Sequence, residues 1–187
     1  MAAENHSAND TNPEEGVATL LSYAELLTTP RLARLYVYVL QHGPVSVQTV
    51  TDDLDLPNST AYNYVGELEE MGLLTRHDEE SPARLTVEPV RLELETDHAG
   101  VVATPALVAA VARQLDDEDI RLFVDRQGVA KLAAALHYTL RVQDGELTQR
   151  TATNRLGVHP VEGMTVITAL QDVVEAATEY DPALNAE

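Results

Sequence analysis

The sequence predicts a mainly helical protein with a small β-element, an α+β fold. Apolar residues recur at helical spacing through most of the chain. Two short runs that favour strands, residues 73–77 and 84–87, are joined by an acidic segment that contains Pro82. The chain has 187 residues, of which 44% are hydrophobic, and this is enough to build a buried core.

The first part of the chain is predicted to hold a tail and two helices. Residues 1–15 are polar and acidic and lack apolar periodicity, which indicates a disordered tail. Amphipathic spacing then predicts a helix over residues 17–28. A second helix follows, with Thr29 as its N-cap and Pro30 at its first position, and it stops at Gly43.

The next segment is predicted to form two short helices separated by a turn, and then a hairpin. Ser46 caps the first of these helices, which Pro57 ends. Ser59 opens the second, and Gly72 stops it before the two strands. The core-facing residues of this second helix are Ala61, Val65, Leu68 and Met71.

The rest of the chain is predicted to be extended at first and then helical. Residues 89–104 alternate between apolar and polar side chains on both sides of a turn near Gly100. Beyond them, helical spacing returns in four segments, which begin at Thr104, Ile120, Val129 and Val161.

The charge balance is strongly acidic. There are 31 Asp and Glu residues against 12 Lys and Arg residues, which gives a net charge of −19, and Lys131 is the only lysine. Such a chain could be a generic acidic protein that avoids nucleic acid, or it could carry the surface of a halophile that keeps molar salt in its cytoplasm. We favour the halophile because the acidic excess is spread over the whole chain while lysine has almost vanished.

Several classes of chemistry find no support in the sequence. It has no Cys, no run of about 20 apolar residues and no signal-peptide pattern, so we expect a cytoplasmic protein without a membrane segment. The six histidines lack metal-ligand spacing, and nucleotide-binding and acyl-transfer motifs are absent. We therefore predict no enzyme activity, no metal and no cofactor. The acidic run 116–119 could attract a cation, but we expect it to cap the next helix.

The segment 45–76, VSVQTVTDDLDLPNSTAYNYVGELEEMGLLTR, carries the strongest functional signal. It has helix-turn-helix spacing and ends in Leu68-Glu69-Glu70-Met71-Gly72-Leu73-Leu74. In these two features it resembles the winged helix-turn-helix of transcriptional regulators such as the MarR and ArsR groups, over about residues 29–90. The resemblance implies a sequence-specific DNA-binding regulator, and the acidic composition suggests a halophilic archaeon as its source.

The helix that starts at Ser59 is the predicted recognition helix. A major groove admits one helix, which must be held by the core on one side and remain open to base edges on the other. Asn can pair with adenine, and hydroxyl groups can bond to bases or phosphates. The candidate reading residues are Asn58, Ser59, Thr60, Tyr62 and Asn63. The candidate cations for the DNA backbone are Arg31, Arg34, Arg76 and Arg84.

One observation keeps a second interpretation open. Residues 58–71 contain no Arg or Lys but include Glu67, Glu69 and Glu70. A DNA-binding protein in molar salt could tolerate this, because counterion release then contributes little and uncharged contacts matter more. The alternative is a winged helix that binds protein, as an adaptor in a transcription or chromosome-organising complex.

These patterns together predict a domain organisation. Residues 1–15 form the tail, 16–90 the winged helix-turn-helix with its N-terminal helix, and 91–187 a mostly helical region for dimerisation or sensing. The first and last long helices, 17–28 and 161–178, are candidates for the seam of a homodimer, since palindromic half-sites call for two-fold symmetry. A small-molecule effector is possible, but no residue pattern identifies it.

Two segments of the C-terminal half carry weaker signals. Residues 120–155 are locally basic. Residues 146–174 weakly resemble a second helix-turn-helix, although an ordinary helical hairpin gives the same pattern.

Overall fold

A computed structural model of the chain describes residues 13–96 and 99–184. The helices are α1 (Pro13–Thr28), α2 (Pro30–His42), α3 (Val47–Asp53), α4 (Asn58–Glu70), α5 (Pro105–Arg113), α6 (Glu118–Gln127), α7 (Val129–Gln143), α8 (Gln149–Leu156), α9 (Pro160–Ala177) and the 3-10 helix η1 (Pro182–Leu184). The strands are β1 (Thr75–His77), β2 (Arg84–Thr86), β3 (Leu92–Thr96) and β4 (Ala99–Ala103).

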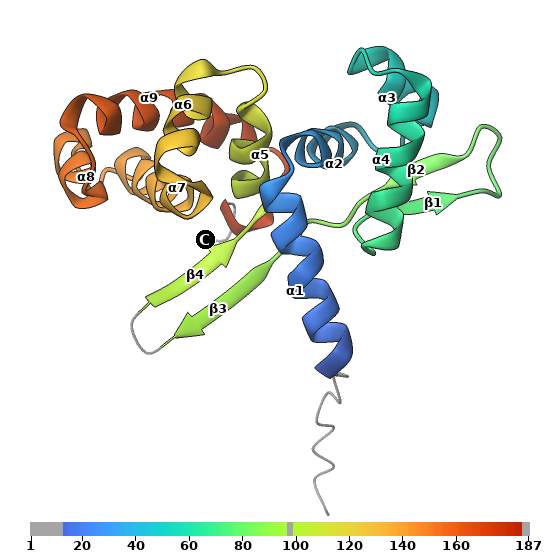
Figure 1. Cartoon of the computed structure of the whole chain (residues 1–187), viewed down its shortest axis with the longest axis horizontal. Coiled ribbons are helices and arrows are strands. Elements are labelled where there is room, and N and C mark those ends of the chain that lie inside the picture. The colour runs from blue at the N-terminus through green and yellow to red at the C-terminus, as the bar shows by residue number, and fades with distance from the viewer. Residues whose placement is uncertain (1–12, 97–98, 185–187) are drawn as a thin grey trace, which may run out of the picture.

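Helix α2 is the centre of the arrangement (Figure 1). It packs on α3, α4 and β2 towards one end of the molecule, and on α1 and α5 towards the other. Its buried residues are Leu32, Ala33, Leu35, Tyr36, Val37 and Val39. Because these residues face both ends, one apolar core runs from α4 through α2 into the helices α5–α9. Helix α1 and the β3–β4 hairpin project from the middle of the molecule.

The predicted fold class is confirmed, since the structure is mainly helical with two small antiparallel sheets. Ser46 caps α3 as predicted, because its side chain accepts a hydrogen bond from the backbone N–H of Thr49. Several boundaries differ from the prediction: the strands expected over 73–77 and 84–87 are shorter, and the helices expected from Ile120 and Val161 begin one or two residues earlier. Helix α4, the predicted recognition helix, begins at Asn58, with Pro57 at the N-cap. Helix α1 begins at Pro13, which includes the end of the expected tail, and residues 1–12 lie outside the described part of the chain.

Tyr36 joins α2 to the chain that leaves the second strand. Its side chain is fully buried, its hydroxyl donates to the carbonyl oxygen of Glu88 at 2.6 Å, and it accepts from the N–H of Val90 at 2.9 Å. Burial raises the pKa of Tyr36 above its usual value. The neutral phenol therefore holds the segment that follows β2 against the central helix.

Asp181, near the other end of the chain, also joins segments that are far apart in the sequence. It is fully buried, and its carboxylate accepts from the N–H of Ala106 at 2.9 Å and from the N–H of Ala183 at 3.0 Å. Thr104, the N-cap residue of α5, makes no side-chain cap bond. A carboxylate near the C-terminal end of the described chain therefore satisfies a backbone donor in the first turn of α5.

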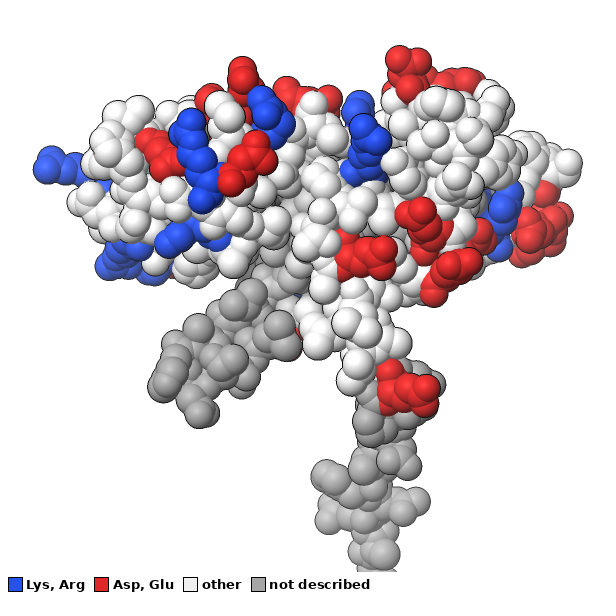
Figure 2. Space-filling view, viewed as in Figure 1, with Lys and Arg blue, Asp and Glu red and all other residues white. Residues whose placement is uncertain are grey.

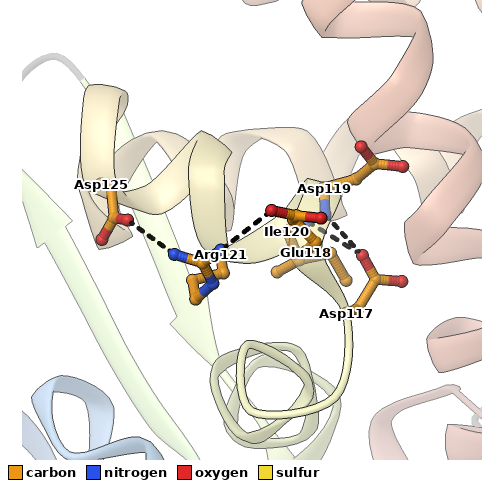
Figure 3. Close-up of polar contacts among 6 residues, drawn as sticks. All are labelled: Asp117, Glu118, Asp119, Ile120, Arg121 and Asp125. Carbon is orange, nitrogen blue, oxygen red and sulfur yellow. Dashed lines mark hydrogen bonds and ion pairs between the residues drawn. The ribbon is translucent and has the colours of Figure 1, made fainter.

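The acidic run before α6 acts as a helix cap (Figure 3). The Asp117 side chain accepts from the N–H of Asp119 at 3.0 Å and from the N–H of Ile120 at 3.1 Å. Arg121 lies 3.2 Å from Glu118 and 3.6 Å from Asp125, which adds ion pairs along the same helix. The capping role expected for this run is confirmed.

The two candidate seam helices differ in what they leave exposed. Most apolar residues of α9 are buried within its own chain, namely Val166, Ile167, Leu170, Val173 and Val174, whereas Val161 and Met164 near its start are exposed. Helix α1 instead contacts the rest of the chain near its C-terminal end, where Leu26 is buried. Its earlier apolar residues Val17, Leu20 and Leu21 are 57%, 40% and 64% exposed. Of the two helices, α1 therefore keeps the larger unpartnered apolar surface.

Candidate nucleic-acid interface

Helix α4 is held to the core by one face only. Ala61, Val65 and Leu68 are each fully buried, and their spacing places them on one side of the helix. Gly72 ends the helix with a φ of +69°, a conformation that costs other residues free energy. The N–H of Leu73 then bonds back to the carbonyl oxygen of Leu68 at 2.9 Å. These contacts fix the direction of α4 and the point where the chain turns towards β1.

The opposite side of α4 is polar and exposed. Asn58, Ser59, Tyr62 and Asn63 are exposed, and we call these four residues the polar α4 face. Thr60 is half-buried beside them. Tyr62 is 53% exposed, although it is a large aromatic residue. The structure thus brings together the five reading residues predicted from the sequence at the N-terminal half of one helix.

The wing, formed by β1, β2 and the loop 78–83, lies beside α4. Its strands pair antiparallel, with Arg76 opposite Leu85 and His77 opposite Arg84. Leu85 is fully buried and also exchanges two backbone hydrogen bonds with Val45, of 2.7 and 3.2 Å. The segment before α3 therefore acts as a third, short partner of the sheet. This bridge holds the wing to the helix-turn-helix.

Arg76 connects the wing with the polar α4 face. Its guanidinium carbon lies 5.9 Å from the centre of the Tyr62 ring, which is within the range of a cation–π contact. Its Nε lies 3.2 Å from Asp78, and one Nη lies 3.9 Å from Glu69. The side chain is 28% exposed, so it is largely engaged within the protein. Arg76 therefore positions Tyr62 while its own charge is partly neutralised.

The other predicted cations lie in different places. Arg84 is on β2 and forms an ion pair of 3.6 Å with Glu80 at the end of the wing loop. Arg31 is exposed in the first turn of α2. Arg34 lies further along α2 and forms an ion pair of 3.6 Å with Asp116, which precedes α6. The structure therefore brings Arg76 and Arg84 to the wing, but it does not bring Arg34 to the same surface.

The surface of α4 and the wing is acidic. Residues 58–86 contain two basic residues, Arg76 and Arg84, against six acidic ones, Glu67, Glu69, Glu70, Asp78, Glu79 and Glu80. Figure 2 shows Asp and Glu side chains gathered at this end, while Lys and Arg side chains are more frequent at the end formed by α6–α9. A phosphate backbone would meet more repulsion than attraction here at low ionic strength.

The structure also contains a feature that the sequence did not predict. A cleft of about 250 Å³ lies where α2 and α3 meet α5 and α9, and Arg34 is one of its lining residues. Its walls come from segments far apart in the sequence, so no local pattern could have revealed it.

Two other kinds of site are absent from the described residues. Within residues 13–96 and 99–184, no group of three or more His, Asp or Glu side chains is arranged to hold a metal ion. No helix in the same ranges is both long and apolar enough to cross a bilayer.

Two parts of the chain match known protein families. Residues 30–93 match the family described as sugar-specific transcriptional regulator TrmB, whose members are DNA-binding regulators with a winged helix. This range runs from the start of α2 through the wing into β3. Residues 114–179 match a family of unknown function, DUF7437, and this range covers α6–α9. Neither curated proteins nor solved structures gave a significant match.

Proposed function

We propose that this protein is a transcriptional regulator that reads the major groove of DNA with the polar α4 face. The observation that carries the proposal is the two-sidedness of α4. One side is fixed in the core by fully buried residues, and the other offers Asn58, Ser59 and Asn63 at the N-terminal half of the helix. Helix N-termini favour phosphate, and Asn side chains can pair bidentately with adenine. The TrmB-type match over residues 30–93 supports DNA as the partner.

The acidic surface sets the conditions under which such binding would work. Molar salt shortens the screening distance to about 3 Å, so carboxylates near the groove would repel phosphates far less. Specific contacts would then come from uncharged hydrogen bonds and shape complementarity. Lys131, the only lysine, is half-buried and donates to the carbonyl oxygen of Leu156 at 3.1 Å. The one lysine of the chain thus serves a hydrogen bond within the fold and not the exposed surface. This supports our proposal that the surface is adapted to the cytoplasm of a halophilic archaeon.

We further propose that the regulator acts as a homodimer through α1. The exposed residues Val17, Leu20 and Leu21 form an apolar strip on a helix that projects from the body (Figure 1). A second copy would cover this strip about a two-fold axis, and two α4 helices could then read the halves of a palindromic site.

The test is fluorescence anisotropy with labelled DNA from upstream of the protein's own gene, in multi-molar KCl. The proposal predicts saturable binding by the native protein and a changed sequence preference for Asn63→Ala. Arg76→Gln should weaken binding to all sequences, because the guanidinium contacts with Tyr62, Glu69 and Asp78 are lost. Arg150→Gln on α8 is the matched control and should bind as the native protein does. Absence of specific binding at every salt concentration would refute the proposal.

A second candidate function is supported by the ion pairs of the wing. Because Arg76 and Arg84 both have carboxylate partners and α4 carries three glutamates, this surface could instead bind a basic segment of another protein. The same titration separates the two functions. An adaptor would not bind DNA, and it would bind a lysine-rich peptide with an affinity that falls as the salt concentration rises.

A further inference from the structure

The cleft between the two ends of the molecule has the size and lining of a small-molecule site. Its volume of about 250 Å³ lies just below the roughly 300–1,000 Å³ typical of pockets for drug-sized ligands, so a small metabolite would suit it. Much of the lining is aliphatic, contributed by Val37, Leu54, Ala109, Ala112, Val173 and Ala176.

Polar side chains that line the cleft already bridge its two sides. Gln41 of α2 lies beside Tyr180, which follows α9, and burial raises the pKa of Tyr180, so its phenol stays neutral. Arg34 approaches Asp116 across the cleft at 3.6 Å. That distance is too long for a hydrogen bond, so both groups keep bonding capacity for an occupant.

Two further charged residues line the cleft without partners. Arg113 ends α5, Asp172 lies on α9, and both belong to the lining at its exposed rim. Among the described residues, neither one forms an ion pair or a side-chain hydrogen bond, and they do not pair with each other. Beside the Arg34–Asp116 pair, the cleft therefore presents one unpaired positive and one unpaired negative group next to an aliphatic lining.

We infer that this cleft binds a small zwitterion of the α-amino acid type with an aliphatic side chain. The ligand carboxylate would pair with Arg113 and the ligand ammonium with Asp172, each through charge-assisted hydrogen bonds. The ligand side chain would cover the aliphatic lining. A simple carboxylate or amine would satisfy only one of the two charges, and a neutral sugar would satisfy neither.

A ligand in this cleft would contact the central helix of the winged-helix part directly. Val37 and Gln41 belong to α2, the helix on which α3, α4 and β2 pack. A ligand held between α2 and α9 would bias the position of the reading helix, and DNA would in turn change the affinity for the ligand by the same factor. This coupling rests on the proposed function, whereas binding to the cleft does not.

The test is isothermal titration calorimetry of the full chain in multi-molar KCl, with the proteinogenic L-amino acids added singly. At least one aliphatic amino acid should bind. For L-leucine the matched probes are isocaproate, which lacks the ammonium, and isoamylamine, which lacks the carboxylate. Each should bind at least about tenfold more weakly, because one charge-assisted contact is lost.

Variants locate the site and separate this inference from the proposed function. Arg113→Gln and Asp172→Asn should each weaken amino-acid binding at least about tenfold, while Arg150→Gln outside the cleft should not. The inference fails if no amino acid binds, if the single-charge probes or glucose bind as well as the zwitterion, or if either variant binds like the native protein. DNA binding without amino-acid binding would refute only this inference. Amino-acid binding without DNA binding would refute only the regulator.

Discussion

The buried hydroxyl of Tyr36 offers a sharp test of how the winged helix is held together. In Tyr36→Phe, the N–H of the buried Val90 loses its acceptor, whereas the carbonyl of the exposed Glu88 can turn to water. An unsatisfied buried donor costs about 1–3 kcal/mol, so we expect a loss of about 2 kcal/mol in the free energy of unfolding. For a chain of this size that corresponds to a fall in Tm of roughly 4–8 °C.

Alkaline pH provides a second measurement on the same side chain. The pKa of Tyr36 is raised in the folded state above its unperturbed 10.0, chiefly by burial, so the folded protein favours the neutral phenol. Its contribution to stability is complete below about pH 10 and is lost as pH rises further, by up to about 1.4 kcal/mol per pH unit. Tyr36→Phe should therefore lose stability less steeply above pH 10 than the native protein does.

Both effects can be measured by circular dichroism during thermal and urea unfolding in multi-molar KCl. Tyr62→Phe, a change on an exposed side chain, should leave the Tm unchanged and serves as the control. The reasoning would be refuted if Tyr36→Phe had the native Tm and lost stability with pH as steeply as the native protein.

Four further predictions follow from other parts of the structure. Asp181→Ala should lower the free energy of unfolding by about 1.5–3 kcal/mol per lost charged hydrogen bond, and an unchanged urea midpoint would contradict the capping role. Gly72→Ala should cost about 1–2 kcal/mol, measured by the same unfolding, because its left-handed backbone strains a side chain even where space is open. Glu67→Gln combined with Glu70→Gln should strengthen DNA binding in low-salt anisotropy and change it little in molar KCl, whereas an equal effect at both salts would exclude charge repulsion. Leu21→Glu should convert the proposed dimer to a monomer in sedimentation velocity, and a variant that remains dimeric would rule out α1 as the seam.

Local patterns predicted much of the fold. Gly72 was expected to stop a helix and does so with a positive φ, and Ser46 caps α3 through its side chain. The buried face of α4 follows directly from helical spacing at Ala61, Val65 and Leu68. Such features depend on residues within one or two turns of each other, which is the range over which sequence periodicity carries information.

Contacts between distant segments could not be predicted in the same way. Tyr36 bonds to residues 52 and 54 positions away, and Asp181 bonds to a residue 75 positions away. Helical spacing puts Tyr36 on the same apolar face as Leu32 and Val39, but it contains no information about the partner. Arg34 shows what this means for the site. It was predicted to contact DNA, but the sequence could not reveal that it lies 3.6 Å from Asp116, a residue from the second half of the chain.

Selection from a random duplex pool in multi-molar KCl would show whether the polar α4 face reads base sequence. We expect the native protein to enrich a two-fold symmetric motif with half-site centres about one or more helical turns apart, and Asn63→Ala to enrich a different motif or none. If the pool stayed unbiased, or if both proteins enriched the same motif, the polar α4 face would not be the reading surface.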